Sequence, residues 1–137
     1  MAEAILARAI GQSGIRGRVC ADSAGAFAFE GERAAAHAVA AMAERGLDIS
    51  AHRAKRVSGE LAERADIILA MTRAQAIQVE AMFPAAAGKV YTLGDFAGGM
   101  GDVPDPYGGS MEEYRACAAQ IETAVGGIVS RLEGELR

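Results

Sequence analysis

Ile67-Ile68-Leu69-Ala70-Met71 decides the fold class, because it is a continuous apolar run in the middle of the chain. A run of this length suits a β-strand buried on both faces, as the strands of parallel sheets are. A second strand is predicted for Val90-Tyr91-Thr92-Leu93 and a third for Arg18–Ser23, ahead of the turn at Ala24-Gly25. Strands that alternate with helices indicate a three-layer α/β/α fold with a parallel sheet.

The helices are predicted by apolar residues at helical spacing and by capping residues. They are expected to begin near residues 1, 35, 58, 72 and 110. Thr72 with Gln75, and Ser110 with Glu113, have the spacing of capping boxes at the start of two of these helices. Two adjacent glycines, Gly126-Gly127, interrupt the final helix, where each costs about 1 kcal/mol relative to alanine.

The first predicted helix begins at the first residue of the sequence. Ala2, Ile5, Leu6, Ala9 and Ile10 form one apolar face of it. In α/β enzymes that handle phosphate, the turn between a strand and such a helix is the usual place for the chemistry. We therefore expect a further strand and a reactive loop to precede Met1, and that strand would enlarge the sheet.

Composition limits the classes of function. The 137 residues are 51% hydrophobic, which suits one domain with a real core, and the net charge of −4 disfavours nucleic acid and anionic membranes as partners. We expect a cytoplasmic protein, because no apolar run could span a bilayer and the N-terminus lacks a signal-peptide pattern. Cys20 and Cys117 are too few and too far apart for a disulfide framework or a metal site.

Asp105 is the first candidate for chemistry, within Val103–Ser110. Pro104 and Pro106 restrict the backbone on both sides of it. One interpretation is a rigid turn that leads into a helix cap. The other is a carboxyl group held stiffly over a pocket as a general acid, with Tyr107 as an aromatic wall.

Other polar residues are less specific on their own. Asp22-Ser23-Ala24-Gly25 reads as a strand end with a turn, and His52 as a loop histidine. The basic cluster of Arg53, Lys55 and Arg56 is either a solvated surface or a means of recruiting an anionic substrate. Neither cysteine has the arginine six positions later that a phosphatase nucleophile requires, since Ala26 and Thr123 stand there.

Taken in order, five segments resemble the low-molecular-weight protein tyrosine phosphatase family. They are MAEAI at the start, DSAG, GLDISAHRAKRV, ADIILAM and DVPDPYGGSMEEY. Within the family, Ala24–Ala28, Met71-Thr72 with Gln75, and the DPYGGS run are most similar to the bacterial branch that dephosphorylates protein arginine. Arsenate reductases share the fold but use additional cysteines, and residues 72–93 contain none.

The resemblance implies roles for particular residues. It assigns Asp105 as the general acid, Tyr107 as an aromatic residue at the pocket edge, and Ser23 and His52 as residues that hold the phosphate loop. It implies phosphorylated protein substrates, carrying phosphotyrosine or phosphoarginine, with no cofactor and no metal. In the family, a Cys-x5-Arg loop supplies a nucleophilic thiolate and an arginine that clamps the phosphate.

That loop lies immediately before the MAEAI segment in the family. Residues 1–137 are therefore expected to form a single domain without the family's first and central strand, one of four, and without its phosphate loop. On this interpretation the chain as written lacks the nucleophile and the clamping arginine, and is inactive by itself. The alternatives are a truncated, catalytically inactive family member that acts as a binding module, or an unrelated α/β protein.

Overall fold

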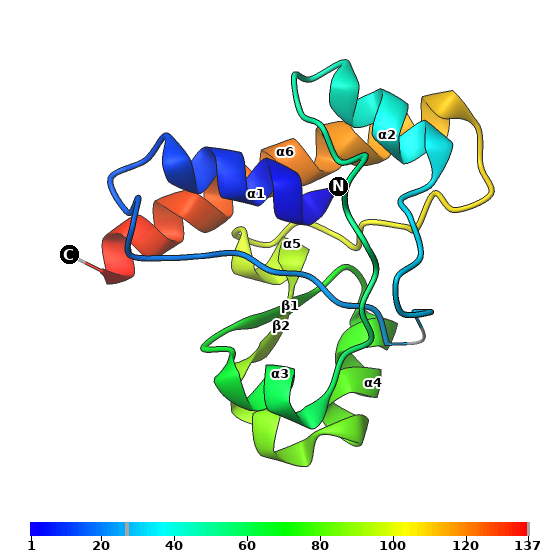
Figure 1. The fold of residues 1–137 in the computed structure, drawn as a ribbon. Helices are drawn as coiled ribbons and strands as arrows, with labels where there is room; N and C mark the ends of the chain where they lie inside the picture. Colours follow the sequence, from blue (N-terminus) through cyan, green and yellow to red (C-terminus); the bar gives the residue numbers. More distant parts are fainter. Residues whose placement is uncertain (27, 137) are drawn as a thin grey trace.

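The computed structural model describes residues 1–26 and 28–136. Phe27, which belongs to one of the segments similar to the arginine-specific branch, lies outside the described residues. The chain forms an α/β fold around a short parallel sheet (Figure 1).

The sheet consists of β1 (Ile68–Ala70) and β2 (Val90–Thr92), which pair in parallel with Leu69 opposite Tyr91. Helix α4 (Arg73–Met82) and the 3-10 helix η1 (Pro84–Lys89) form the connection between them. Both strands were predicted from the sequence, and each is shorter than the apolar run that predicts it. Leu69 and Tyr91 face the main core, while Ala70 is buried outside it, so the sheet is covered on both faces and apolar residues do not alternate with polar ones.

The third predicted strand, Arg18–Ser23, is wrong. In the described structure no neighbouring strand pairs with this segment. An extended segment becomes a strand only where a neighbour exchanges backbone hydrogen bonds with it. Pairing begins only at Gly25, in an isolated bridge with Arg56. There the Gly25 N–H donates to the Lys55 carbonyl at 2.9 Å, and the Val57 N–H donates to the Gly25 carbonyl at 3.0 Å.

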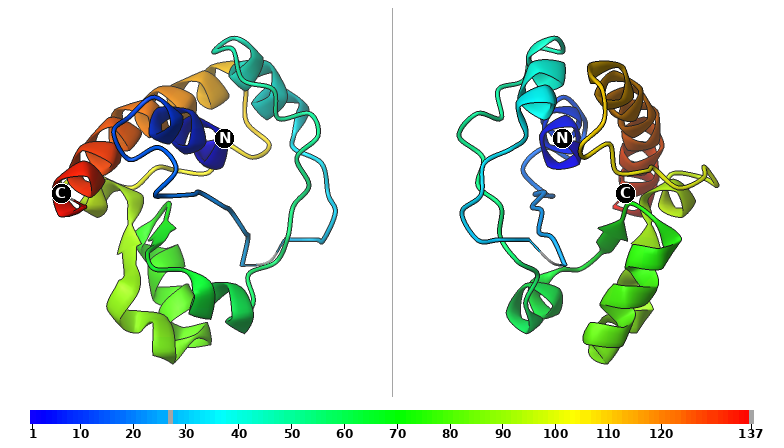
Figure 2. Two further views of the ribbon diagram at one scale, coloured as in Figure 1. Left: turned by 60° about the vertical axis from the view of Figure 1, so that its left-hand side comes forward. Right: turned by 90° about the vertical axis from the view of Figure 1, so that its right-hand side faces the viewer.

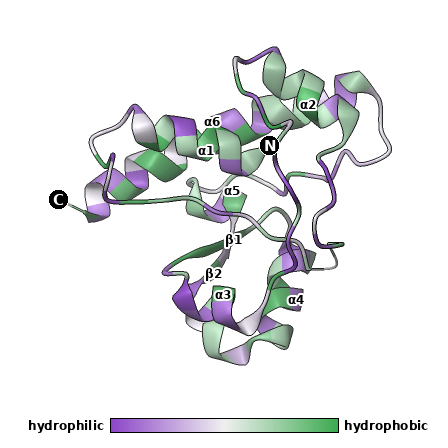
Figure 3. Ribbon diagram, in the orientation of Figure 1, coloured by the Kyte–Doolittle hydropathy of each residue, from purple (hydrophilic) through white to green (hydrophobic). Residues whose placement is uncertain are grey.

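The main core lies on one face of the sheet. Helices α1 (Ala2–Gly11), α2 (Ala36–Ala43) and α6 (Met111–Glu135) pack together there, with α1 alongside α6 (Figures 1 and 2). Helix α6 alternates apolar and polar stretches around its axis (Figure 3), as expected of a helix with one buried face. Its buried side chains are Tyr114, Cys117, Ala118, Ile121, Ala124, Val125, Ile128 and Val129.

The other face of the sheet is covered by α3 (Gly59–Arg64), α4 and η1, which completes the three layers (Figure 2). This side has a much thinner core. Its buried apolar residues are small, and they are Ala62, Ala70, Ala76, Val79 and Ala86. Larger apolar side chains of α4 point to solvent instead, with Ile77 59% exposed.

The predicted helix caps are present. Thr72 Oγ1 accepts a hydrogen bond from the Gln75 N–H, and Ser110 Oγ accepts one from the Glu113 N–H, both at 3.2 Å. Thr92 begins α5 (Leu93–Phe96) in the same way. In the described part of the chain, no helix combines the length and apolar character needed to cross a membrane.

Candidate functional site

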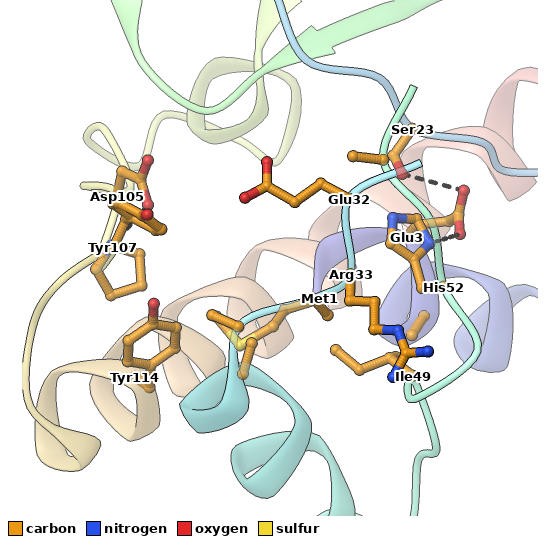
Figure 4. Close-up of a pocket in the computed structure, with 16 residues that line it drawn as sticks. Met1, Glu3, Ser23, Glu32, Arg33, Ile49, His52, Asp105, Tyr107 and Tyr114 are labelled. Atoms are coloured by element: carbon orange, nitrogen blue, oxygen red, sulfur yellow. Dashed lines mark hydrogen bonds and ion pairs between the residues drawn. The ribbon is translucent and has the colours of Figure 1, made fainter. Parts of the chain in front are cut away.

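One pocket brings together all four site residues expected from the sequence. Its cavity volume is about 310 Å³, and Asp105, Tyr107, Ser23 and His52 all line it. The first turn of α1 and the segment before α2 complete its wall (Figure 4). These four residues are separated by up to 84 positions in the chain, so only the tertiary fold places them around one cavity.

The loop that carries Asp105 is anchored at its start to the end of β1. Val103 is 1% exposed, and its N–H donates to the Met71 carbonyl at 2.9 Å. The Asp102 carboxylate accepts a hydrogen bond from the Arg73 N–H at 3.1 Å, at the start of α4. Two residues beyond this anchor, Asp105 is held close to the sheet although its own side chain is exposed.

The backbone after Asp105 turns tightly. Asp105 Oδ1 accepts a hydrogen bond from the Tyr107 N–H at 3.0 Å, which orients the carboxylate. The Gly109 N–H closes the turn on the Pro106 carbonyl at 2.7 Å, and Gly108 has a φ of +78° that favours glycine. Tyr107 is 77% exposed at the mouth of the pocket, so a bound ligand can cover it.

The opposite side of the pocket is organised by Glu3, which the sequence reading did not single out. Ser23 Oγ donates to Glu3 Oε1 at 3.1 Å, and His52 Nδ1 lies 3.7 Å from Glu3 Oε2. Figure 4 shows these three residues across the pocket from Asp105 and Tyr107. The only local signal for Glu3 is an acidic residue in the first turn of α1, where the helix dipole favours it.

Tyr114 belongs to the buried face of α6, and it also lines the pocket. It is buried, and His37 of α2 packs edge-on against its ring, with the ring centres 5.6 Å apart. Burial raises the pKa of Tyr114, and the negative charge of Asp105 raises it further. Tyr114 therefore remains a neutral phenol and presents its hydroxyl group as a hydrogen-bond partner.

Neither cysteine lines this pocket. Cys117 is buried, its Sγ donates to the Pro104 carbonyl at 3.8 Å, and burial raises the pKa of its thiol. Cys20 is exposed on the segment before Ser23. Within residues 1–26 and 28–136, no group of acidic, histidine or cysteine side chains is arranged to bind a metal ion. The chemistry of the described pocket thus rests on carboxylate, imidazole, hydroxyl and guanidinium groups.

Comparison with known proteins gives consistent matches over nearly the whole chain. The family model described as low molecular weight phosphotyrosine protein phosphatase matches residues 1–137. The chain is 38% identical over 114 residues to a protein-arginine-phosphatase of Geobacillus stearothermophilus, covering 82% of this chain and 76% of that protein. It is 39% identical over 110 residues to a probable low molecular weight protein-tyrosine-phosphatase, EpsP, of Ralstonia solanacearum, covering 80% and 74% of the two chains.

A solved structure agrees with these matches. The YwlE arginine phosphatase from Geobacillus stearothermophilus superimposes with a TM-score of 0.89 at 36% identity. The superposition covers 98% of this chain and 84% of that one.

Proposed function

The chain belongs to the low molecular weight phosphotyrosine protein phosphatase family, and from this membership we propose that it hydrolyses phosphotyrosine or phosphoarginine side chains of proteins. The observation that carries the proposal is the single pocket shared by Asp105, Tyr107, Ser23 and His52. A carboxyl group on a rigid loop, opposite the first turn of a helix, suits an acid that acts on an anion bound at a helix N-terminus.

In the proposed reaction, a cysteine thiolate attacks phosphorus and a sulfur–phosphorus bond forms. The bond from phosphorus to the tyrosine oxygen or arginine nitrogen breaks, and the Asp105 carboxyl protonates that leaving atom. Water then attacks the phosphocysteine, Asp105 accepts its proton, and the thiolate leaves with release of inorganic phosphate. Asp105 therefore serves first as a general acid and then as a general base.

The thiolate is proposed to come from a Cys-x5-Arg segment ahead of Met1. Support comes from the positions of the two cysteines, because Cys117 is buried against Pro104 and Cys20 lies outside the pocket lining. Beside the first turn of α1, Ser23 is hydrogen-bonded to Glu3 and His52 lies 3.7 Å from the Glu3 carboxylate. Their proposed role is to hold that phosphate-binding loop in shape.

Phosphoarginine is the proposed preference of the two substrates. Glu32 and Asp105 both line the pocket, and the Glu32 carboxylate points into it (Figure 4). Carboxylates attract a guanidinium ion, whereas the phenol ring of phosphotyrosine carries no such charge. Rates for a phosphoarginine and a phosphotyrosine peptide of the same sequence would decide between them.

Free thiols also agree with a reducing compartment. Cys20 and Cys117 form no disulfide, as is usual in the cytoplasm, which is the location proposed here.

The central test is the Asp105→Asn variant of the protein in the form its own cell makes. We expect turnover of an alkyl or otherwise poor leaving group to fall by about 10²- to 10⁴-fold, because such a group needs protonation. Turnover of p-nitrophenyl phosphate, whose leaving group needs little protonation, should fall much less. Asp66→Asn, at an exposed aspartate outside the pocket lining, is the matched control. Equal losses for both leaving groups would remove Asp105 from the proposed role.

A second candidate function is a catalytically inactive binding module. The absence of both cysteines from the pocket lining favours it if no nucleophile precedes Met1. Mass spectrometry of the native N-terminus separates the two functions. A product extended by a Cys-x5-Arg segment supports the phosphatase. A product that begins at Met1, and that retains phosphopeptides without hydrolysing them, supports the module.

A further inference from the structure

Two arginines lie opposite each other on paired segments beside the pocket, and one of them, Arg33, lines it. Arg33, just before α2, and Arg53, just after His52, form an isolated antiparallel bridge. Beside it, the Ala54 N–H donates to the Glu32 carbonyl and the Gly31 N–H donates to the Ala54 carbonyl, both at 2.8 Å. Directly opposed residues of an antiparallel pair project their side chains on the same side of it.

This pairing is electrostatically unfavourable in the structure as it stands. Like charges placed directly opposite each other on paired strands destabilise the pairing. Among the described residues, no ion pair includes Arg33 or Arg53. Arg53 instead donates to the carbonyls of His52 and Ser50, at 3.0 and 3.4 Å.

Neighbouring charges do not neutralise the pair. Glu32 precedes Arg33, but in Figure 4 its carboxylate points away from the Arg33 guanidinium, as expected for successive residues of an extended segment. Lys55, from the same basic cluster, differs because its ammonium group is paired with Asp22 at 2.5 Å. The charge of the arginine pair is therefore available to a ligand, while that of Lys55 is already matched.

We propose that Arg33 and Arg53 bind the carboxylate of an acidic residue that flanks the phosphorylated residue of a protein substrate. Arg33 lines the same pocket as Asp105, and Figure 4 shows the two on different sides of it. Arg53 is outside the pocket lining but is joined to Arg33 by the bridge, so residues that flank a phosphorylated side chain in the pocket would lie near the pair. Guanidinium groups suit a carboxylate because they bind it with paired N–H donors. The inference rests on the proposed phosphatase function.

The first experiment compares two phosphopeptides that differ only in having Asp or Asn beside the phosphorylated residue. With the native protein at low salt, kcat/KM should favour the acidic peptide by up to about fivefold, the range of an exposed ion pair, and salt should reduce the preference. In Arg33→Gln and Arg53→Gln the ratio should fall to about one. Arg64→Gln, at an exposed arginine of α3 paired with Glu60, should keep the preference. A ratio of one in the native protein would overturn the inference.

The second experiment needs no catalysis. Without ligand, each glutamine variant should raise Tm by about 1–3 °C at low salt, because one of two opposed charges is removed. An unphosphorylated peptide rich in aspartate should raise the Tm of the native protein but not that of the variants. A lower Tm in both variants, or an equal response to the peptide, would show that the arginines serve only the fold.

The two experiments also separate this inference from the proposed function. p-Nitrophenyl phosphate has no flanking residue, so its hydrolysis reports on the phosphatase alone. If it is hydrolysed and the peptide preference is absent, only the arginine site fails. If nothing is hydrolysed, the phosphatase proposal fails and the Tm measurements still decide whether the arginine pair binds an acidic segment.

Discussion

Gly126 and Gly127 are neighbours in α6, yet alanine substitutions at them should have opposite effects on stability. A Cβ atom added to Gly126 meets nothing within 4 Å. One added to Gly127 would lie 2.2 Å from the carbonyl oxygen of Ala97, and 3.1 Å from its carbonyl carbon. Ala97 is the C-cap residue directly after α5, so the obstacle is backbone that cannot rotate out of the way.

The expected magnitudes follow from these distances. Either substitution gains up to about 1 kcal/mol of helix propensity. Gly126→Ala should keep that gain. In Gly127→Ala the new methyl group would be more than 1 Å inside the 3.4 Å at which ordinary contact begins, and forcing the helices apart should cost about 1–3 kcal/mol. The two variants should therefore differ in free energy of unfolding by about 1–3 kcal/mol, with Gly127→Ala the less stable.

Urea unfolding followed by circular dichroism measures this difference. The midpoint should rise in Gly126→Ala and fall in Gly127→Ala, with unchanged slopes, and Tm should move by about 3–4 °C per kcal/mol. The unsubstituted protein and the Gly126 variant together control for helix propensity. If both variants gain stability equally, the contact between α5 and α6 at Ala97 is not as described.

Three further predictions concern single residues. A hydrogen bond from Lys55 lowers the pKa of Asp22 from its ordinary value of 3.8. Their pair therefore contributes stability above about pH 4, and this stability is lost as the pH falls through the lowered pKa. In Asp22→Asn the decline of Tm below pH 4 should be shallower. Burial raises the pKa of Cys117, so iodoacetamide should label Cys20 and spare Cys117 in the folded protein, as peptide mass spectrometry would show. Ser110→Ala removes the cap of α6 and should lower the free energy of unfolding by about 1 kcal/mol in chemical denaturation; no loss would mean that the cap contributes nothing.

The sequence predicted those parts of the fold that depend on near neighbours in the chain. The caps at Thr72 and Ser110 involve residues three positions apart, so their spacing is sufficient to identify them. The apolar runs around Ile68 and Tyr91 similarly identify β1 and β2. Arg18–Ser23 shows the limit of this reasoning, because whether an extended segment is a strand depends on a partner elsewhere in the fold.

The site depended on information that local patterns do not contain. Nothing near His52 in the chain indicates that Glu3 lies beside it, and that contact crosses almost fifty residues. The proline-flanked motif pointed to Asp105 and Tyr107, and family resemblance supplied Ser23 and His52. Glu3, Arg33 and Tyr114 emerged only from the structure. The sequence did not identify Tyr114 as a site residue, because a position on the apolar face of α6 is equally typical of a core residue.

The thin alanine core beneath α4 has a consequence for how the protein fails on heating. Small buried side chains remove little apolar area from water, so the α3 and α4 layer should open before the core around α1 and α6 does. Asp102 is tied to the first amide of α4, and Asp105 would lose that support when α4 opens. Heat inactivation should therefore set in while most of the helical structure is still intact.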